Sequence, residues 1–155
     1  MISLVVGLVL AQSPVPREIG AIRYLVGDWT GSVSGANVSL GVSQGPGGRS
    51  LKFSLRVTGS LIKPFSDEGF VWWDKETAAY RSHAMSSVSN EPRVEIGRIT
   101  GGGLVMVSEP FEVSGISERT RRTFIAEGDG LRMKLELRDG DSWKPSFSTL
   151  LKKRR

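Results

Sequence analysis

The chain of 155 residues contains no cysteine and only one histidine, His83. The lack of cysteine excludes disulfides, thiol catalysis and thiolate metal sites. A single histidine without an acidic neighbour at metal-ligand spacing favours a hydrogen-bonded or exposed strand residue over a metal ligand. A Ser–His–acid triad cannot be built on His83 without assuming tertiary contacts.

The acidic residues lack a catalytic pattern as well. No pair of carboxylates suggests glycoside hydrolysis, and no loop has the ligand spacing of a calcium site. By strand phase, the dispersed glutamates are expected to point mostly outward: Glu91, Glu95, Glu109, Glu112 and Glu118. We therefore predict a protein that is not an enzyme and requires no metal or other cofactor.

Long apolar runs are also scarce. The run at residues 1–11 is too short to cross a bilayer of roughly 30 Å as a helix. Val9 and Ala11 occupy the positions that precede a signal-peptidase cut before Gln12, although no basic residue precedes the run. A buried N-terminal strand is the alternative. We predict a signal peptide over residues 1–11, export to the periplasm or beyond, and a single mature domain over 12–155 without a transmembrane segment.

Positive charge exceeds negative charge, and the formal net charge is +5. The excess comes from Arg119, Arg121 and Arg122 and from the basic C-terminal run 152–155. No aromatic residues interleave with these charges. We interpret them as a solvated strand face and a chain end rather than a phosphate or anionic-lipid site, and we expect no nucleic-acid partner.

Alternation of apolar and polar residues is abundant, most clearly over residues 51–57 and 131–138. About ten such segments, separated by turns rich in glycine and aspartate, indicate an antiparallel meander, because parallel pairs need long crossovers. Closure would remove exposed strand edges, so the sequence predicts an all-β, antiparallel up-and-down barrel. The expected strands are 30–34, 37–43, 51–57, 68–74, 78–86, 93–100, 103–108, 119–127, 131–138 and 143–151.

One short helix is expected before the first strand. Ile19, Ile22 and Leu25 recur at intervals of three residues within Pro16–Val26 and form one apolar stripe. A helix of about two turns is marginal alone, so it must pack on another element. A position over one mouth of the barrel would bury its stripe.

Three segments together resemble a family: residues 25–31 (Leu-Val-Gly-Asp-Trp-Thr-Gly), 69–77 (Gly-Phe-Val-Trp-Trp-Asp-Lys-Glu-Thr) and 148–153 (Ser-Thr-Leu-Leu-Lys-Lys). They are similar to small exported bacterial lipocalin-like proteins of the calycin group, a family of unknown function. This resemblance implies a lipocalin-like barrel that Trp29 closes at one end.

In lipocalins the tryptophan of the Gly-x-Trp motif, here Gly27 and Trp29, packs beneath a basic side chain of the last strand. The resemblance assigns that role to Lys152 or Lys153, with Arg154 as the alternative. A fainter resemblance links the chain to heme-binding nitrobindin-type barrels. Those supply a histidine from late in the chain, whereas His83 lies in a middle strand, which argues against heme.

Adjacent Trp72 and Trp73 must point to opposite faces of their strand. We assign Trp72, with Phe70, to the interior, where the ring either packs in the core or forms a wall for an apolar ligand. Large interior residues fill a barrel of about eight strands, so a cavity requires about ten strands or a flattened section. The candidate ligand-binding residues are Phe53, Phe70, Trp72, Met106 and Met133.

The leading hypothesis is that the barrel binds a small hydrophobic molecule without catalysis. One alternative is a ligand-free structural or interaction module of the cell envelope, its barrel filled by its own side chains. The other is a heme-binding or enzymatic barrel that uses His83. Interior volume distinguishes the first two, because a ligand needs a cavity.

Overall fold

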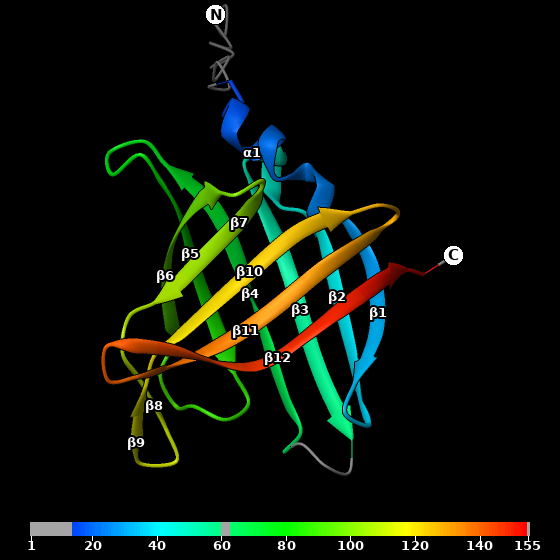
Figure 1. The fold of residues 1–155 in the computed structure, drawn as a ribbon. Helices are drawn as coiled ribbons and strands as arrows, with labels where there is room; N and C mark the ends of the chain where they lie inside the picture. Colours follow the sequence, from blue (N-terminus) through cyan, green and yellow to red (C-terminus); the bar gives the residue numbers. More distant parts are fainter. Residues whose placement is uncertain (1–13, 60–62, 155) are drawn as a thin grey trace, which may run out of the picture.

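A computed structural model describes residues 14–59 and 63–154. Ten strands close into an antiparallel barrel in the order β1-β12-β11-β10-β7-β6-β5-β4-β3-β2 (Figure 1). The all-β prediction is therefore confirmed, whereas the predicted signal peptide over residues 1–11 lies outside the described residues. The barrel strands are β1 (Gly27–Val33), β2 (Ala36–Gln44), β3 (Ser50–Gly59), β4 (Phe65–Asp74), β5 (Ala79–Ser86), β6 (Arg93–Thr100), β7 (Gly103–Ser108), β10 (Thr120–Glu127), β11 (Gly130–Asp139) and β12 (Ser142–Lys153).

A separate hairpin interrupts the meander between β7 and β10. Its strands β8 (Phe111–Val113) and β9 (Ile116–Glu118) pair only with each other. In Figure 1 the hairpin lies below the barrel, at the end away from the N-terminal helix. We call this end the lower mouth and the end near the helix the upper mouth.

The N-terminal segment covers the upper mouth (Figure 1). It comprises helix α1 (Arg17–Ala21) and the 3₁₀ turn η1 (Arg23–Leu25). Ile19, Ile22 and Leu25 are all buried, as their spacing predicted. The α-helix is shorter than the predicted span 16–26, because the chain tightens into η1 before it enters β1.

Two tyrosines fasten this cap to the barrel. The Tyr24 hydroxyl donates to the Phe124 carbonyl oxygen at 2.9 Å and accepts from the Leu104 amide at 3.0 Å. The Tyr80 hydroxyl donates to the Glu18 carbonyl oxygen at 2.8 Å. These bonds connect the N-terminal segment with β5, β7 and β10, and satisfy polar groups that the cap would otherwise bury unpaired.

Alkaline pH should loosen the Tyr80 connection. Burial, together with the charges of Glu18 and Tyr24, raises the pKa of Tyr80 from 10.0 to about 12. Because the unfolded chain loses this proton first, Tyr80 stabilises the fold fully below pH 10, and this contribution disappears as the pH rises through about 12. We expect the free energy of unfolding in urea to fall less over this range in Tyr80→Phe than in the unaltered protein. Equal falls would contradict the expectation.

The upper half of the barrel interior is packed. Apolar side chains from five strands and from η1 surround a residual space of only about 30 Å³, which is room for one water molecule. All of the side chains around it are buried. They are Leu25, Leu40, Val42, Leu51, Phe53, Val71, Leu104, Met106 and Phe124, with Arg122 below them.

Trp29 closes this packed half. The indole is only 6% exposed, and its Nε1 donates to the Leu25 carbonyl oxygen at 2.8 Å. Lys153 Nζ lies 5.6 Å from the centroid of the ring. A β-carbon on Gly27, whose φ is +146°, would lie 2.7 Å from Lys153 Cε, so the glycine makes room for this lysine.

Of the two lysines predicted, Lys153 is therefore the basic partner of Trp29, and the prediction is wrong for Lys152. Trp29 is directly opposite Lys153 in the β1–β12 pair, whereas Lys152 is opposite Thr30. Successive side chains of a strand point to opposite faces. Lys152 consequently points outward and forms an ion pair with Asp129 at 2.5 Å.

Candidate functional site

The structure divides the predicted binding residues between the two faces of the barrel wall. Phe53, Met106 and Met133 are buried in the interior core. Phe70 is 44% exposed, and the Trp72 ring makes an edge contact with His83 at 5.2 Å between centroids. The assignment of Phe70 and Trp72 to the interior is wrong.

The reason is the phase of β4. Asp67, Gly69 and Val71 are buried, and Trp73 packs against the core and against the Tyr80 ring. β4 carries one tryptophan on each face, so tryptophan alone does not identify the inner face. The outer face also carries Phe70, and the pair of Phe70 and Trp72 was therefore assigned to the interior. The inner face carries a glycine and an aspartate, which made it look like the solvent face.

His83 lies on the outer face of β5, exposed and directly opposite Phe70. Its neighbours Ser82 and Ala84 are buried on the other face. The imidazole therefore does not point toward the interior serines or into the barrel. A heme held inside the barrel could not use this side chain without a reversal of strand phase.

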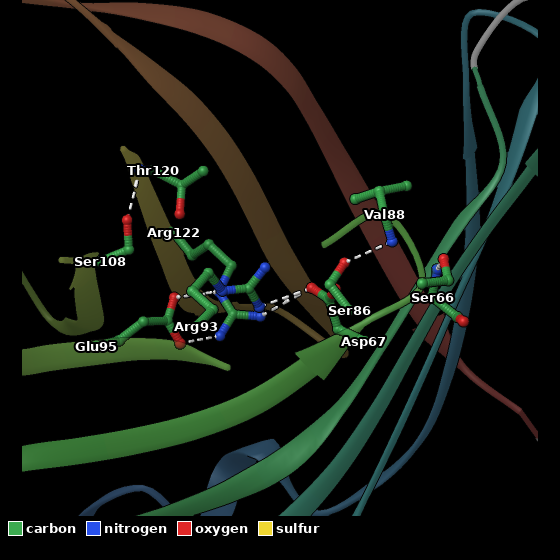
Figure 2. Close-up of polar contacts among 10 residues, drawn as sticks. Ser66, Asp67, Ser86, Val88, Arg93, Glu95, Ser108, Thr120 and Arg122 are labelled. Atoms are coloured by element: carbon green, nitrogen blue, oxygen red, sulfur yellow. Dashed lines mark hydrogen bonds and ion pairs between the residues drawn. The ribbon is translucent and has the colours of Figure 1, made fainter. Parts of the chain in front are cut away.

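Four charged side chains meet inside the barrel. We call Asp67 of β4, Arg93 and Glu95 of β6, and Arg122 of β10 the ion cluster. Figure 2 shows the two guanidinium groups between the carboxylates of Glu95 and Asp67. The members come from non-adjacent strands, since β5 separates β4 from β6 and β7 separates β6 from β10.

The ion cluster is connected by hydrogen bonds as well as by charge. Arg122 donates two hydrogen bonds to the Glu95 carboxylate, from Nε to Oε1 at 2.8 Å and from Nη2 to Oε2. Arg93 donates to Asp67 Oδ2 at 2.6 Å, and its Nε lies 3.5 Å from Glu95 Oε1. Arg122 also approaches Asp67 Oδ2 at 3.9 Å. Two cations and two anions thus compensate one another.

Burial and neighbouring charges act differently on the two arginines. Burial lowers the pKa of Arg93, but the Glu95 and Asp67 carboxylates outweigh it and raise that pKa overall. Burial and the positive charge of Arg93 prevail at Arg122 and lower its pKa, although Glu95 and Asp67 oppose them. Arginine keeps its proton in proteins, so both guanidinium groups are positively charged at neutral pH.

The sequence analysis missed this cluster, and two of its expectations are wrong. Glu95, expected to point outward, is 0% exposed, and Arg122, interpreted as part of a solvated face, is buried. Asp67 and Arg93 were not singled out. The available signal was weak: Arg93 and Glu95 share one face of a strand, and Arg122 shares its face with Phe124.

A cavity of about 190 Å³ lies beside the ion cluster toward the lower mouth. Phe111, Val113 and Glu118 of the β8–β9 hairpin contribute to its wall. The Arg93 guanidinium carbon lies 5.8 Å from the centre of the Phe111 ring, in cation–π contact. The other apolar lining residues are Leu55, Phe65, Val88, Leu135 and Leu137, and the polar ones are Asp67, Ser86, Arg93, Thr120 and Arg122.

Three polar atoms at this cavity lack hydrogen-bond partners within residues 14–59 and 63–154. They are Asp67 Oδ1, Arg93 Nε and Thr120 Oγ1, all from buried side chains that line the cavity. Buried polar atoms are nearly always paired, and an unpaired one costs about 1–3 kcal/mol. A hydrogen-bonding group that enters the cavity would satisfy these atoms.

The chain matches no protein-family model and no curated protein. The arrangement of the site must accordingly be interpreted from its own geometry.

A second hollow lies at the upper mouth, outside the barrel. It measures about 450 Å³ and is bordered by α1, the start of β5 and the end of β6. Trp73 and Tyr80 are among its walls, with Arg17 and Arg98 at its edges. No buried, unpartnered polar atom of the described residues borders this hollow, so the lower cavity is the stronger candidate site.

Neither a metal-ligand cluster nor a membrane-spanning helix occurs within residues 14–59 and 63–154. Within them, no three His, Asp or Glu side chains are grouped so that they could hold a metal ion. No helix in the same segments has the length and apolar character needed to cross a membrane.

Proposed function

We propose that the chain is an exported, lipocalin-like barrel that binds a small, mainly apolar molecule in the lower cavity without catalysing a reaction. The observation that carries the proposal is the cavity of about 190 Å³ with mainly apolar walls and three polar atoms that have no hydrogen-bond partner in the described residues. Small-molecule sites are concave and mostly apolar, with few polar groups that fix orientation. The lipocalin assignment is supported by Trp29 beneath Lys153, next to Gly27.

The volume limits the ligand. Pockets for drug-sized molecules measure about 300–1,000 Å³, whereas a cavity of about 150 Å³ holds benzene. At about 190 Å³, the lower cavity fits one ring with one or two additional heavy atoms. A long fatty acid or a tetrapyrrole is too large for it.

Binding fits the site better than catalysis does. The Glu95 carboxylate is held by Arg122, and one oxygen of Asp67 is held by Arg93. The carboxylate oxygens that the arginines occupy are not available to exchange a proton with a bound molecule. The one imidazole, His83, lies outside the barrel wall.

A small aromatic probe should bind in the cavity. We expect toluene to bind the unaltered protein with a Kd of about 0.1–1 mM, because most of its surface would leave water. Val113→Phe should fill the cavity from the hairpin and weaken binding about tenfold or more. Chemical-shift changes in a nuclear magnetic resonance titration measure both affinities.

Ile116→Phe provides the matched control. Ile116 pairs directly with Val113 in the hairpin but is 63% exposed and does not line the cavity. This variant should bind toluene like the unaltered protein. Equal weakening by the two variants, or no binding to the unaltered protein, would contradict the proposal.

A structural or interaction module is the second candidate. The packed upper half of the barrel and exposed apolar side chains on the outer wall favour it. Phe70, Met85 and Ile96 are exposed on the adjacent strands β4, β5 and β6. If no probe enters the lower cavity, this candidate becomes the better interpretation.

A further inference from the structure

We propose that the molecule bound in the lower cavity carries a neutral hydroxyl group. This hydroxyl group donates a hydrogen bond to Asp67 Oδ1 and accepts one from the Ser86 hydroxyl. The inference rests on the proposed function and adds the chemical class of the ligand. The expected ligand is a one-ring phenol or alcohol and not a hydrocarbon, a carboxylate or an amine.

The first support is the free acceptor on Asp67. The residue is 1% exposed, and its Oδ2 accepts from Arg93 at 2.6 Å. Oδ1 has no partner in the described part of the chain. A carboxylate oxygen accepts hydrogen bonds, so the partner that Asp67 Oδ1 lacks is a donor.

The second support is the position of Ser86. It lies directly opposite Asp67 in the β4–β5 pair, and both residues line the cavity. Directly opposed side chains have β-carbons about 4.5–5.5 Å apart, so one ligand oxygen can contact both. Ser86 Oγ accepts from the Val88 amide at 3.5 Å, which leaves the serine hydroxyl free to donate.

The third support is the charge balance of the ion cluster. Arg93 and Arg122 already compensate Asp67 and Glu95. A ligand carboxylate or ammonium group would therefore bring an uncompensated charge into a buried site, which is unfavourable. A hydroxyl group satisfies the free acceptor without changing the net charge.

A panel of small one-ring molecules tests the chemical class. Toluene, p-cresol, benzoate and benzylamine share a ring, are similar in size and differ in the polar group. With the unaltered full chain, we expect p-cresol to bind about tenfold more tightly than toluene, because its hydroxyl group bonds to a charged acceptor. The carboxylate and the amine should bind more weakly than p-cresol. Nuclear magnetic resonance titrations measure the four affinities.

Two serine variants test the placement. Ser86→Ala should reduce the preference for p-cresol over toluene by about threefold or more and leave toluene binding unchanged. Ser82→Ala is the matched control, because Ser82 lies on the same strand, is buried and has an unpartnered hydroxyl, but does not line the cavity. It should leave the preference unchanged.

The possible outcomes separate this inference from the proposed function. If toluene binds and p-cresol binds no more tightly, or if the carboxylate binds best, the hydroxyl inference is overturned and the binding function stands. A preference for p-cresol that survives Ser86→Ala overturns the placement. If none of the four molecules binds, the proposed function itself fails. The panel on the unaltered protein decides the chemical class even if a variant does not fold.

Discussion

Replacing Glu95 with alanine is expected to lower the free energy of unfolding by about 3–5 kcal/mol. The substitution leaves Arg122 buried without its bidentate partner, and the neighbouring Arg93 then adds repulsion. Domains of this size are stable by only about 5–15 kcal/mol, so the loss is a large fraction of the total. Equilibrium unfolding in urea measures it.

Two further variants show which property of Glu95 accounts for the loss of stability. Glu95→Gln tests charge against side-chain volume, and Glu136→Ala tests the effect of burial. Glu95→Gln removes the charge but keeps the side-chain volume. If the lost charge is the cause, this variant should lower the free energy of unfolding almost as much as Glu95→Ala does. Glu136→Ala removes the partner of Arg121, which binds that carboxylate through two bonds of 2.6 and 2.7 Å but at a partly exposed position. The exposed pair should cost no more than about 1 kcal/mol. Similar losses for Glu95→Ala and Glu136→Ala would show that burial does not matter at the ion cluster.

The second large effect is expected at Trp29. Trp29→Ala should cost about 3–5 kcal/mol, the range for truncation of a buried aromatic side chain. The substitution removes the plug of the upper mouth, the bond to the Leu25 carbonyl oxygen and the ring beneath Lys153. Urea unfolding again provides the measurement.

Trp143 of β12 is the matched control for Trp29. Its ring contacts two cations, Arg121 at 4.9 Å and Arg138 at 5.3 Å, but it is only partly buried on the outer wall. Exposed cation–π contacts contribute about 0.5–1 kcal/mol each, so Trp143→Ala should cost less than about 2 kcal/mol. A loss at Trp29 as small as this would argue against its role as a plug.

The barrel could be predicted from the sequence because its signal is local. Alternation over 51–57 and 131–138, with turns between short segments, placed all ten barrel strands close to their observed positions. The hairpin at Phe111–Glu118 escaped prediction. Its strands have three residues each, too few to show a period of two.

The site could not be predicted because its signal is tertiary. In β6, Val94 and Ile96 look like a buried face, yet Arg93 and Glu95 are buried instead. That reversal is stable only because Asp67 and Arg122, on strands far away in the sequence, supply the opposite charges. Periodicity within one strand contains no information about such pairing.

The ion cluster also bears on how the barrel finds a single alignment of its strands. A slip of β6 by one residue would move Arg93 and Glu95 to the outer surface and bring Val94 and Ile96 inside. Asp67 and Arg122 would then lose the hydrogen bonds from Arg93 and to Glu95 and keep only their mutual contact at 3.9 Å, an arrangement that costs several kcal/mol. A register shift in β4, β6 or β10 would break the same ion cluster and is therefore energetically unfavourable. This coupling holds although none of these three strands is hydrogen-bonded to another. The buried charges therefore help to fix the register of the strands in the middle of the barrel, which the apolar residues alone would specify less strictly.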